Sequence, residues 1–333
     1  MSNGYLGTLD YADPLYEVLT TQVCREVEEP RFHVSSTSSR RVYKYTEEKT
    51  QRALIGKFFH LQDAGSDRML RLKAEYDNLR KIRGFGFDSS PHYVVRPFAR
   101  HEAIGLAVVE EYIEGKPLDH FFKRAAFRGD GPLLKEKLSA LASFLFALHT
   151  RTATALAVDL EPVEDYFIKV LDSLYRHGIV TAGEERTFLM LMDAWLEQPL
   201  LRRAERVIVH GDATPTNFLF TGKGEVVAID LERMRESDAA IDVSMICGEL
   251  KHAFLWRTGS AAASEPFIGH FLEAYARHSP DPQTVFHRFT ARNPFYMALT
   301  ELRIARNSYL DRGYRRRLVA EAMACLDGGL GRW

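Results

Sequence analysis

The residues with the clearest chemical potential are gathered in the segment 207–232. An apolar run leads into His210 and Asp212, and Asn217 follows five residues after Asp212. A Gly-Lys-Gly turn separates the next two apolar runs, and Asp230 stands at the end of the second. Because a hairpin brings its second strand back to the edge where the first began, we expect Asp230 to lie at the same edge as Asp212 and Asn217.

Two carboxylates and one carboxamide at a single edge form a set of hard oxygen donors. Such a set suits phosphoryl transfer, in which one carboxylate orients the attacking hydroxyl and accepts its proton. A second carboxylate and an amide then hold Mg²⁺ against the phosphates. Any one of these residues alone is more often structural. The combined pattern, placed between short apolar strands, is what indicates chemistry.

The order His-Gly-Asp-x-x-x-x-Asn followed by Ile-Asp-x-Glu resembles the catalytic signature of the aminoglycoside phosphotransferase and choline kinase superfamily, relatives of the protein kinases. The resemblance implies that Asp212 is the catalytic base and that His210 is a scaffold residue of the catalytic loop. It also implies that Asn217 and Asp230 bind Mg²⁺. ATP and Mg²⁺ are therefore the expected cofactors, and the expected partners are a nucleoside triphosphate and a small molecule that offers a hydroxyl group.

Acidic residues further along the chain extend the resemblance. Asp242 lies twelve residues after Asp230, and Glu249 lies seven residues after Asp242, as in the Ile-Asp-Phe-Glu…Asp-Ile…Glu stretch of choline and ethanolamine kinases. The resemblance implies that Asp242 stabilises the loop or caps the following helix, and that Glu249 lies near the acceptor pocket. With Glu232 of the Ile-Asp-x-Glu motif, these two residues are assigned to the substrate side.

A kinase of this kind also needs a lysine on a strand to reach the phosphates of the nucleotide, and a helix glutamate to position that lysine. Lys57 lies in the segment 52–59, which has the pattern of a strand. Glu75 lies in the segment 68–81, whose apolar residues have helical spacing. The sequence therefore predicts a Lys57–Glu75 pair, and the alternative is an exposed strand lysine with a solvated helix glutamate.

The expected phosphate loop departs from the usual glycine-rich form. Residues 35–39 read Ser-Ser-Thr-Ser-Ser. Small hydroxyl residues still let backbone N–H groups approach a phosphate, and their side chains can donate as well. Ser36 and Ser38 are the residues expected to contact the nucleotide here.

The segment from Val108 to Gly115 resembles the hinge between the lobes of kinases. By that resemblance the backbone atoms of Glu111 and Ile113 would hydrogen-bond adenine. Glu110 would then stand where a bulkier apolar residue is common. This exchange is compatible with use of guanine, with a specific water network or with a different register of the hinge.

These site residues require a particular set of elements. Residues 1–30 have the pattern of an N-terminal helical extension, and residues 31–112 have that of an antiparallel, nucleotide-binding lobe. Residues 113–333 are mainly helical and would form the catalytic and acceptor-binding lobe. The expected fold class is therefore α+β: a bilobal protein-kinase-like fold with a small antiparallel β-sheet lobe and a larger, mainly helical lobe.

Composition narrows the functional classes. The net charge is −1, so nothing in the overall charge favours nucleic acid or an anionic membrane as a partner. No stretch has the ~18 apolar residues of a membrane span. The three cysteines are far apart, which is typical of reduced thiols and predicts a cytoplasmic protein. The oligomeric state is left open.

The acceptor is the least determined part of the prediction. The region from residue 241 onward combines acidic and aromatic residues, which suits a cationic alcohol such as an amino alcohol, an amino sugar or an aminoglycoside. The aromatic residues at helical spacing are also explained by core packing. The acidic residues considered are Glu232, Asp238, Glu249, Glu273 and Glu301.

Two alternatives accompany this hypothesis. A cell-envelope sugar or lipopolysaccharide-core kinase would share the fold, and arginines at 202–203 and 315–317 would then meet anionic sugars. A catalytically silent pseudokinase would act as a binding module, although the intact Asp212 and Lys57 argue against it. A protein kinase is disfavoured because Thr214 replaces the usual lysine of the catalytic loop.

Overall fold

The computed structural model describes residues 4–37, 39, 41–59 and 67–330. The chain divides into two compact units. The first comprises Met1–Lys116 with Leu219–Arg233, and the second comprises Pro117–Phe218 with Met234–Trp333. The hairpin that ends at Asp230 thus belongs to the first unit, whereas the sequence pattern had grouped it with residues 113–333.

The first unit is built on an antiparallel sheet of six strands. The alternation of apolar and polar residues along these strands places one face on the core, which includes Phe32 and Leu54. The order is β1 (Tyr5–Thr8), β2 (Phe32–Ser36), β3 (Val42–Glu47), β4 (Ala53–Phe58), β8 (Leu106–Glu111) and β7 (Pro97–His101).

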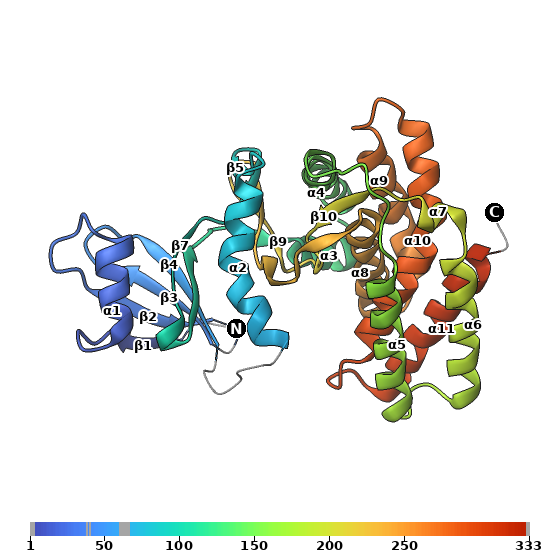
Figure 1. Cartoon of the computed structure of the whole chain (residues 1–333), viewed down its shortest axis with the longest axis horizontal. Helices are drawn as coiled ribbons and strands as arrows, with labels where there is room; N and C mark the ends of the chain where they lie inside the picture. Colours follow the sequence, from blue (N-terminus) through green and yellow to red (C-terminus); the bar gives the residue numbers. More distant parts are fainter. Residues whose placement is uncertain (1–3, 38, 40, 60–66, 331–333) are drawn as a thin grey trace. The chain divides into compact units, whose positions relative to one another are not determined.

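The N-terminal residues are integrated into this sheet. β1 pairs with β2, so residues 5–8 form a strand within the stretch that the sequence predicted to be helical. α1 (Pro14–Val18) begins after Asp13, whose side chain caps the helix by accepting from Leu15 N, and a π-helical turn (Leu19–Val23) follows. The apolar side chains of both turns are buried against the sheet, and Figure 1 shows α1 across strands β1–β3.

A helix and a second sheet complete the first unit. α2 (Asp67–Arg83) covers the predicted helix 68–81. The hairpin segment of residues 219–233 returns here: the side-chain amide of Asn78 on α2 donates to Leu231 O at 2.8 Å. The second sheet has the order β5 (Asp88–Ser89), β6 (His92–Val94), β12 (Val226–Ala228), β11 (Phe218–Phe220) and β9 (Lys116–Pro117). Short 3₁₀ turns lie at Glu102–Ile104 and Leu231–Arg233.

The second unit is mainly helical. β10 (Arg206–Val209) and β13 (Arg235–Asp238) form a two-stranded sheet, which is separate from the sheet that contains the β11–β12 hairpin. The helices are α3 (Leu118–Arg128), α4 (Gly131–Arg151), α5 (Glu161–Arg176), α6 (Ala182–Leu196), α7 (Pro199–Arg202), α8 (Ala240–Thr258), α9 (Glu265–Ala276), α10 (Pro282–Ala305) and α11 (Arg312–Leu330).

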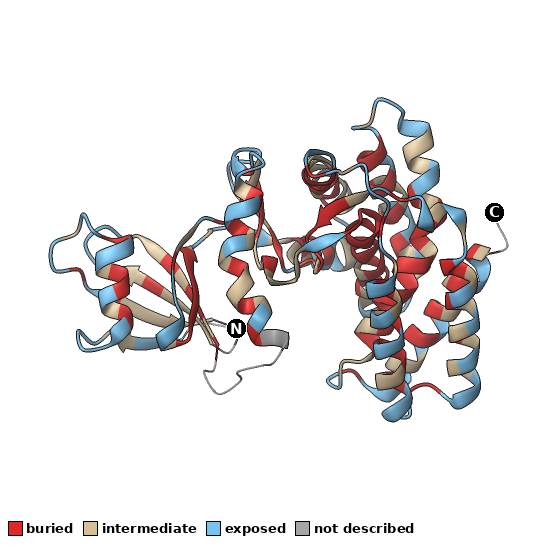
Figure 2. Cartoon of the chain, in the orientation of Figure 1, coloured by how far each residue is buried: buried red, intermediate tan, exposed pale blue. Residues whose placement is uncertain are grey.

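Helices α8 and α10 form the centre of the second unit. Most of their residues are buried, and Figure 2 shows red along much of α8 and along the second half of α10. They approach closely at Gly248, where an added Cβ would lie 2.8 Å from Thr300 Cβ. A helix that is apolar on several faces belongs in a core, and none of the described helices combines the length and apolar character needed to cross a bilayer.

Candidate active site

A buried lysine in the first unit, Lys57, lies among three acidic side chains. Lys57 Nζ on β4 is 2.5 Å from Glu75 Oε1 on α2. It is also 3.7 Å from Glu110 Oε1 on β8 and 3.6 Å from Asp230 Oδ1. Lys57, Glu75 and Glu110 are all buried. The predicted Lys57–Glu75 pair is therefore present in the geometry, and Asp230 lies beside it.

The electrostatics of this cluster are those of one cation shared among several anions. Burial lowers the pKa of Lys57, but Glu110, Glu75 and Asp230 together more than offset it, so its pKa lies well above the ordinary value. Burial raises the pKa of Glu75 and that of Glu110, in both cases against the attraction of Lys57. Such a lysine stays charged at neutral pH.

Asp230 has an unusual backbone. Its φ angle is 65°, in the left-handed region that non-glycine residues rarely occupy. Strained backbone of this kind persists where the surrounding structure holds it, and it is concentrated at functional sites. The conformation places the carboxylate of Asp230 beside Lys57 instead of continuing the strand β12.

The other residues expected to contact the nucleotide have different surroundings in the structure. The hydroxyl of Ser36 and the backbone of Gly4 are within hydrogen-bond distance, at 3.2 and 3.3 Å, so in this structure Ser36 serves the β1–β2 pairing. Ser38 lies outside the described residues. The N–H of Glu111 donates to Arg96 O at 3.0 Å, so an adenine would have to use the carbonyl oxygen of Glu111 and the backbone of Ile113.

In the second unit, the first turn of α8 is hydrogen-bonded to the loop that follows β10. Asp242, in the first turn of α8, accepts hydrogen bonds from the backbone N–H of His210 (2.7 Å) and of Gly211 (3.0 Å). His149 Nε2 lies 3.3 Å from the same carboxylate. Burial opposes the charge of Asp242, but these partners lower its pKa. The loop is therefore anchored by a buried carboxylate.

The anchored loop presents Asp212 and Asn217. The side-chain amide of Asn217 donates to Asp212 O at 2.9 Å, which closes the loop and leaves the amide oxygen of Asn217 for another partner. The N–H of Asp212 is 3.4 Å from His210 Nδ1, and the His210 ring packs on Phe218. His210 thus contacts the loop itself.

The oxygen donors fit Mg²⁺ by their chemistry. The amide oxygen of Asn217 and the carboxylate of Asp230 are both hard ligands. Among the described residues, no group of three or more acidic, histidine or cysteine side chains is placed to hold a metal ion.

A small cavity opens beside Asp212 in the second unit. Arg303 on α10 lies with Nη1 3.5 Å from Asp212 Oδ1 and with Nη2 2.5 Å from Glu249 Oε1. Burial raises the pKa of Glu249, although Arg303 opposes this. The cavity has a volume of about 270 Å³ and is lined in part by Asp119, Glu249, His252, Trp256, Arg257 and Arg303.

The model of the phosphotransferase enzyme family matches residues 33–285, about three quarters of the chain. The chain belongs to this family. Comparison with curated protein sequences finds no match.

Solved structures resemble this phosphotransferase over nearly its whole length. The choline kinase LicA from Streptococcus pneumoniae has 19% identity and a TM-score of 0.55, with 93% of this chain and 99% of that chain covered. An ethanolamine kinase from Plasmodium vivax has 11% identity and a TM-score of 0.58, with 96% and 89% covered. APH(2'')-IIa, in a ternary complex with streptomycin and ATP, has 13% identity and a TM-score of 0.56, with 96% and 99% covered.

At these identities the likeness shows the fold. It confirms the α+β class predicted from the sequence, a protein-kinase-like fold with an antiparallel β-sheet lobe and a mainly helical lobe.

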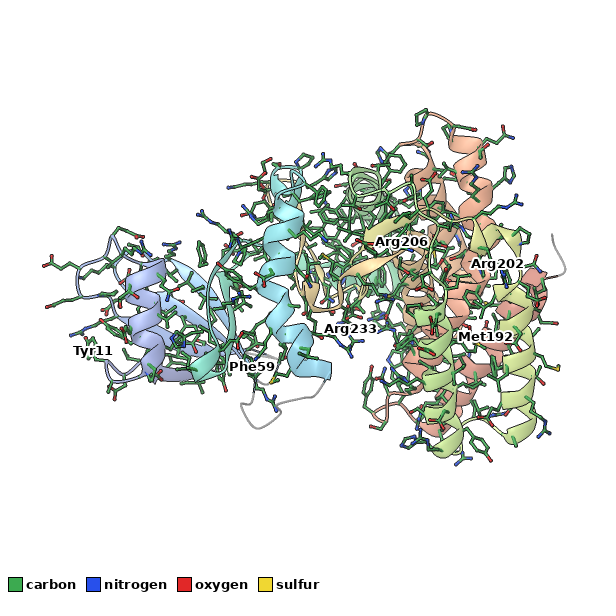
Figure 3. The ribbon with its side chains drawn as sticks, in the orientation of Figure 1. Tyr11, Phe59, Met192, Arg202, Arg206 and Arg233 are labelled. Atoms are coloured by element: carbon green, nitrogen blue, oxygen red, sulfur yellow. The ribbon has the colours of Figure 1, made fainter. Side chains whose placement is uncertain are left out.

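The acidic residues expected on the acceptor side of the phosphotransferase are already engaged. Glu249 alone among them lines the cavity, and it is paired with Arg303. Asp242 is fully buried beneath the loop, which corresponds to the loop-stabilising role and not to contact with a substrate. The others have basic neighbours: Glu232 with Arg233 (labelled in Figure 3), Asp238 with Arg292, Glu273 with Arg277, and Glu301 with Lys251.

Sequence patterns did not predict the contacts of four residues in the two sites. Glu110 pairs with Lys57. Arg303 contacts Asp212, and Asp119 and Arg257 line the cavity as an ion pair. No local signal marks an arginine within a long helix as a site residue. Only the alternation of β8, which puts Glu110 on the same face as Val108, could have indicated that its side chain is buried.

Proposed function

We propose that this phosphotransferase moves the γ-phosphate of ATP to a hydroxyl group of a small molecule. The observation that carries the proposal is the buried Lys57–Glu75 pair with Asp230 3.6 Å from the lysine. A lysine held by a helix glutamate and flanked by a carboxylate is the arrangement that kinases use to bind nucleotide phosphates. The ATP in the complex of APH(2'')-IIa supports the choice of nucleotide.

The roles of the residues follow from their surroundings. Lys57 would bind phosphate oxygens, and Glu75 would keep the ammonium in place. Asp212 would orient the acceptor hydroxyl and take its proton as the new phosphate ester forms. Asn217 and Asp230 would hold Mg²⁺, which supplies positive charge against the phosphates when it is bound. Asp242 and His210 would keep the loop rigid, because positioning accounts for much of the catalysis.

The other candidate functions have less support. Arginines 315–317, considered above as contacts for anionic envelope sugars, are used within the protein: Arg316 pairs with Glu184, whereas Arg315 and Arg317 donate to backbone carbonyls. The intact Lys57 cluster and anchored loop support an enzyme over a silent binding module. The free thiols of Cys24, Cys247 and Cys325 support a reducing, cytoplasmic setting.

A substitution of the proposed base tests the function. Asp212→Asn is expected to lower ATP-dependent phosphorylation by about 10²-fold or more, because the amide cannot accept the proton. The dissociation constant for MgATP should change little. The assay is ATP consumption across amino alcohols, sugars, amino sugars and aminoglycosides, with MgATP binding measured by calorimetry.

Asp193→Asn provides the matched control, because Asp193 is an exposed residue of α6 in the same unit. It should behave as wild type. If Asp212→Asn keeps full turnover, Asp212 is not the base. If wild type consumes no ATP with any acceptor and does not bind MgATP, the proposed function is wrong.

A further inference from the structure

The cavity beside Asp212 contains two ion pairs of the same kind. Arg257 Nη2 lies 2.6 Å from Asp119 Oδ1, and Arg303 Nη2 lies 2.5 Å from Glu249 Oε1. Burial lowers the pKa of His252 to about 4, with help from both arginines, so this third lining group is neutral at physiological pH. The charges around the cavity are therefore two carboxylates and two guanidinium groups.

Both carboxylates already have cationic partners. Asp119 Oδ2 is also 2.6 Å from Lys123 Nζ, so both of its oxygens have a cationic partner. Burial raises the pKa of Asp119, but Lys123 and Arg257 outweigh it and the pKa is lowered, as expected for a carboxylate with two cations. Glu249 is half-buried and pairs with Arg303 through one of its oxygens.

The guanidinium groups, in contrast, retain unused donors. A guanidinium has five N–H groups. Arg303 uses one nitrogen on Glu249 and another, at the longer distance of 3.5 Å, on Asp212. Its Nε is buried and has no hydrogen-bond partner among the described residues. A buried donor without a partner costs free energy, which an acceptor group on a ligand would recover.

We propose that the phosphate acceptor is a small hydroxyl compound that carries an anionic group, a carboxylate or a phosphate, bound by Arg257 and Arg303. This inference rests on the proposed function and specifies its acceptor. It differs from the expectation of a cationic alcohol, because each acidic residue considered for that expectation has a basic neighbour. The position of Arg303, in contact with both Asp212 and Glu249, links the anion-binding groups to the base.

The size of the cavity agrees with a compact acceptor. Its volume of about 270 Å³ lies below the range of roughly 300–1,000 Å³ that is typical of drug-sized ligands. Trp256 and Tyr309 are exposed and also line the cavity. Aromatic walls can attract a quaternary ammonium, and they can equally pack against the apolar face of a ring or chain.

A series of acceptors with one framework and different charges tests the proposal. Glucose, glucosamine, glucuronate and glucose 6-phosphate present a neutral, a cationic, a carboxylate and a phosphate form, and choline is added as a quaternary ammonium. Turnover is measured as ATP consumption, and binding is measured as the shift in Tm with MgATP present. We expect glucuronate or glucose 6-phosphate to exceed glucose in kcat/KM or apparent affinity by about tenfold or more, and glucosamine to fall below glucose.

Substitution of Arg257 shows whether the cavity is responsible. Arg257→Gln should remove most of the preference for the anionic members while KM for ATP stays unchanged, because Asp119 keeps Lys123 as a partner. Arg257→Lys keeps the charge and should restore part of the preference. The matched control is Arg277→Gln, which removes an exposed arginine just after α9 that pairs with Glu273. This control should keep the full preference.

The outcomes separate the two proposals. The anionic acceptor is overturned if glucosamine or choline is preferred, if no anionic member has an effect, or if Arg257→Gln keeps the full preference for anions. In these cases binding of MgATP and turnover of any other acceptor leave the kinase function intact. If wild type neither binds MgATP nor consumes ATP, the kinase function fails, and the inference about its acceptor fails with it.

Discussion

Lys251 and Lys57 occupy the same kind of environment in different units. Each is a buried lysine shared by more than one carboxylate: Lys251 Nζ lies 2.9 Å from Glu321 and 3.3 Å from Glu301. The oxygens of Glu301 are buried and make no hydrogen bond with any described residue. Burial raises the pKa of Glu301 to about 8, although Lys251 opposes it. Such a carboxyl group remains protonated at neutral pH.

The pH dependence of stability should reveal Glu301. Its folded pKa lies above its unfolded value, so between about pH 4.5 and 8 the folded protein holds a proton that the unfolded chain has lost. The free energy of unfolding therefore falls as pH rises through this window, by an amount on the order of a few kcal/mol. Glu301→Gln cannot ionise in either state. Urea unfolding at pH 6, 7 and 8 should show the variant gaining stability relative to wild type as pH increases.

Glu273→Gln is the matched control for this measurement, because Glu273 is an exposed residue of α9 with only a surface partner. It should follow the wild-type curve. Parallel curves for Glu301→Gln and wild type would show that Glu301 is ionised in the folded protein.

Single residues differ in how far the sequence predicts them. The grouping of Lys57 with Glu75 was predictable, because a strand lysine and a helix glutamate are separate local signals. The environment of Glu110 was not, since the distance from Lys57 depends on the β4–β8 register. The cavity charges were misjudged for a related reason. Composition counts acidic residues but does not show that arginines such as Arg303 neutralise them.

Among the elements, α8 and α10 are the pair on which the second unit depends. α8 carries Asp242 and Glu249, and α10 carries Arg303, so the distance between these helices sets the geometry of the cavity. The close approach at Gly248 faces Thr300. A glycine here is a packing requirement, because ridges of one helix fit grooves of the other only if the contact residue is small.

Gly248→Ala should therefore destabilise the protein. Its Cβ would lie 2.8 Å from Thr300 Cβ and Cγ2, and relief of this overlap requires the helices to separate. Overpacking of this kind typically costs about 1–3 kcal/mol. Gly269→Ala in α9 is the matched control: its Cβ would meet no atom within 4 Å, and alanine is the better helix former by about 0.5–1 kcal/mol. Urea unfolding should give opposite signs for the two variants, and equal effects would contradict the packing argument.

The elements were better predicted than their connections. Helical periodicity predicted that the region containing α4, α5 and α6 is mainly helical, because these helices present an apolar stripe to the core. β1 was missed, since Tyr5–Thr8 is short and gains its stability only by pairing with β2. The sequence also did not indicate that β10 pairs with β13 and lies in a different sheet from the β11–β12 hairpin. The pattern of apolar and polar residues within one strand does not indicate which distant strand it pairs with.

At the scale of the whole molecule, nucleotide binding should be visible as stability. A ligand that binds only the folded state raises the free energy of unfolding, by about 2.7 kcal/mol at a hundred times its dissociation constant. MgATP is therefore expected to raise Tm by about 5 °C. Asp230→Ala removes a proposed Mg²⁺ ligand and should abolish most of this shift. Differential scanning fluorimetry with MgATP, and with ATP plus a chelator, measures the effect.

Asp77→Ala is the matched control for Asp230→Ala. Asp77 belongs to the same unit and forms an exposed pair with Arg100, which contributes little to stability. The control should keep the full shift in Tm. A shift that persists in Asp230→Ala would remove Asp230 from the nucleotide site.

The late arrival of residues 219–233 in the first unit has a consequence during protein synthesis. About a hundred residues separate Lys116 from Leu219, which takes a ribosome roughly 5–20 s at typical rates of elongation. During this interval β6 lacks its parallel partner β12, and Asn78 lacks the carbonyl of Leu231. An unpaired strand edge invites pairing with other chains. The nascent first unit thus emerges unfinished, and its completion waits for the segment that also delivers Asp230.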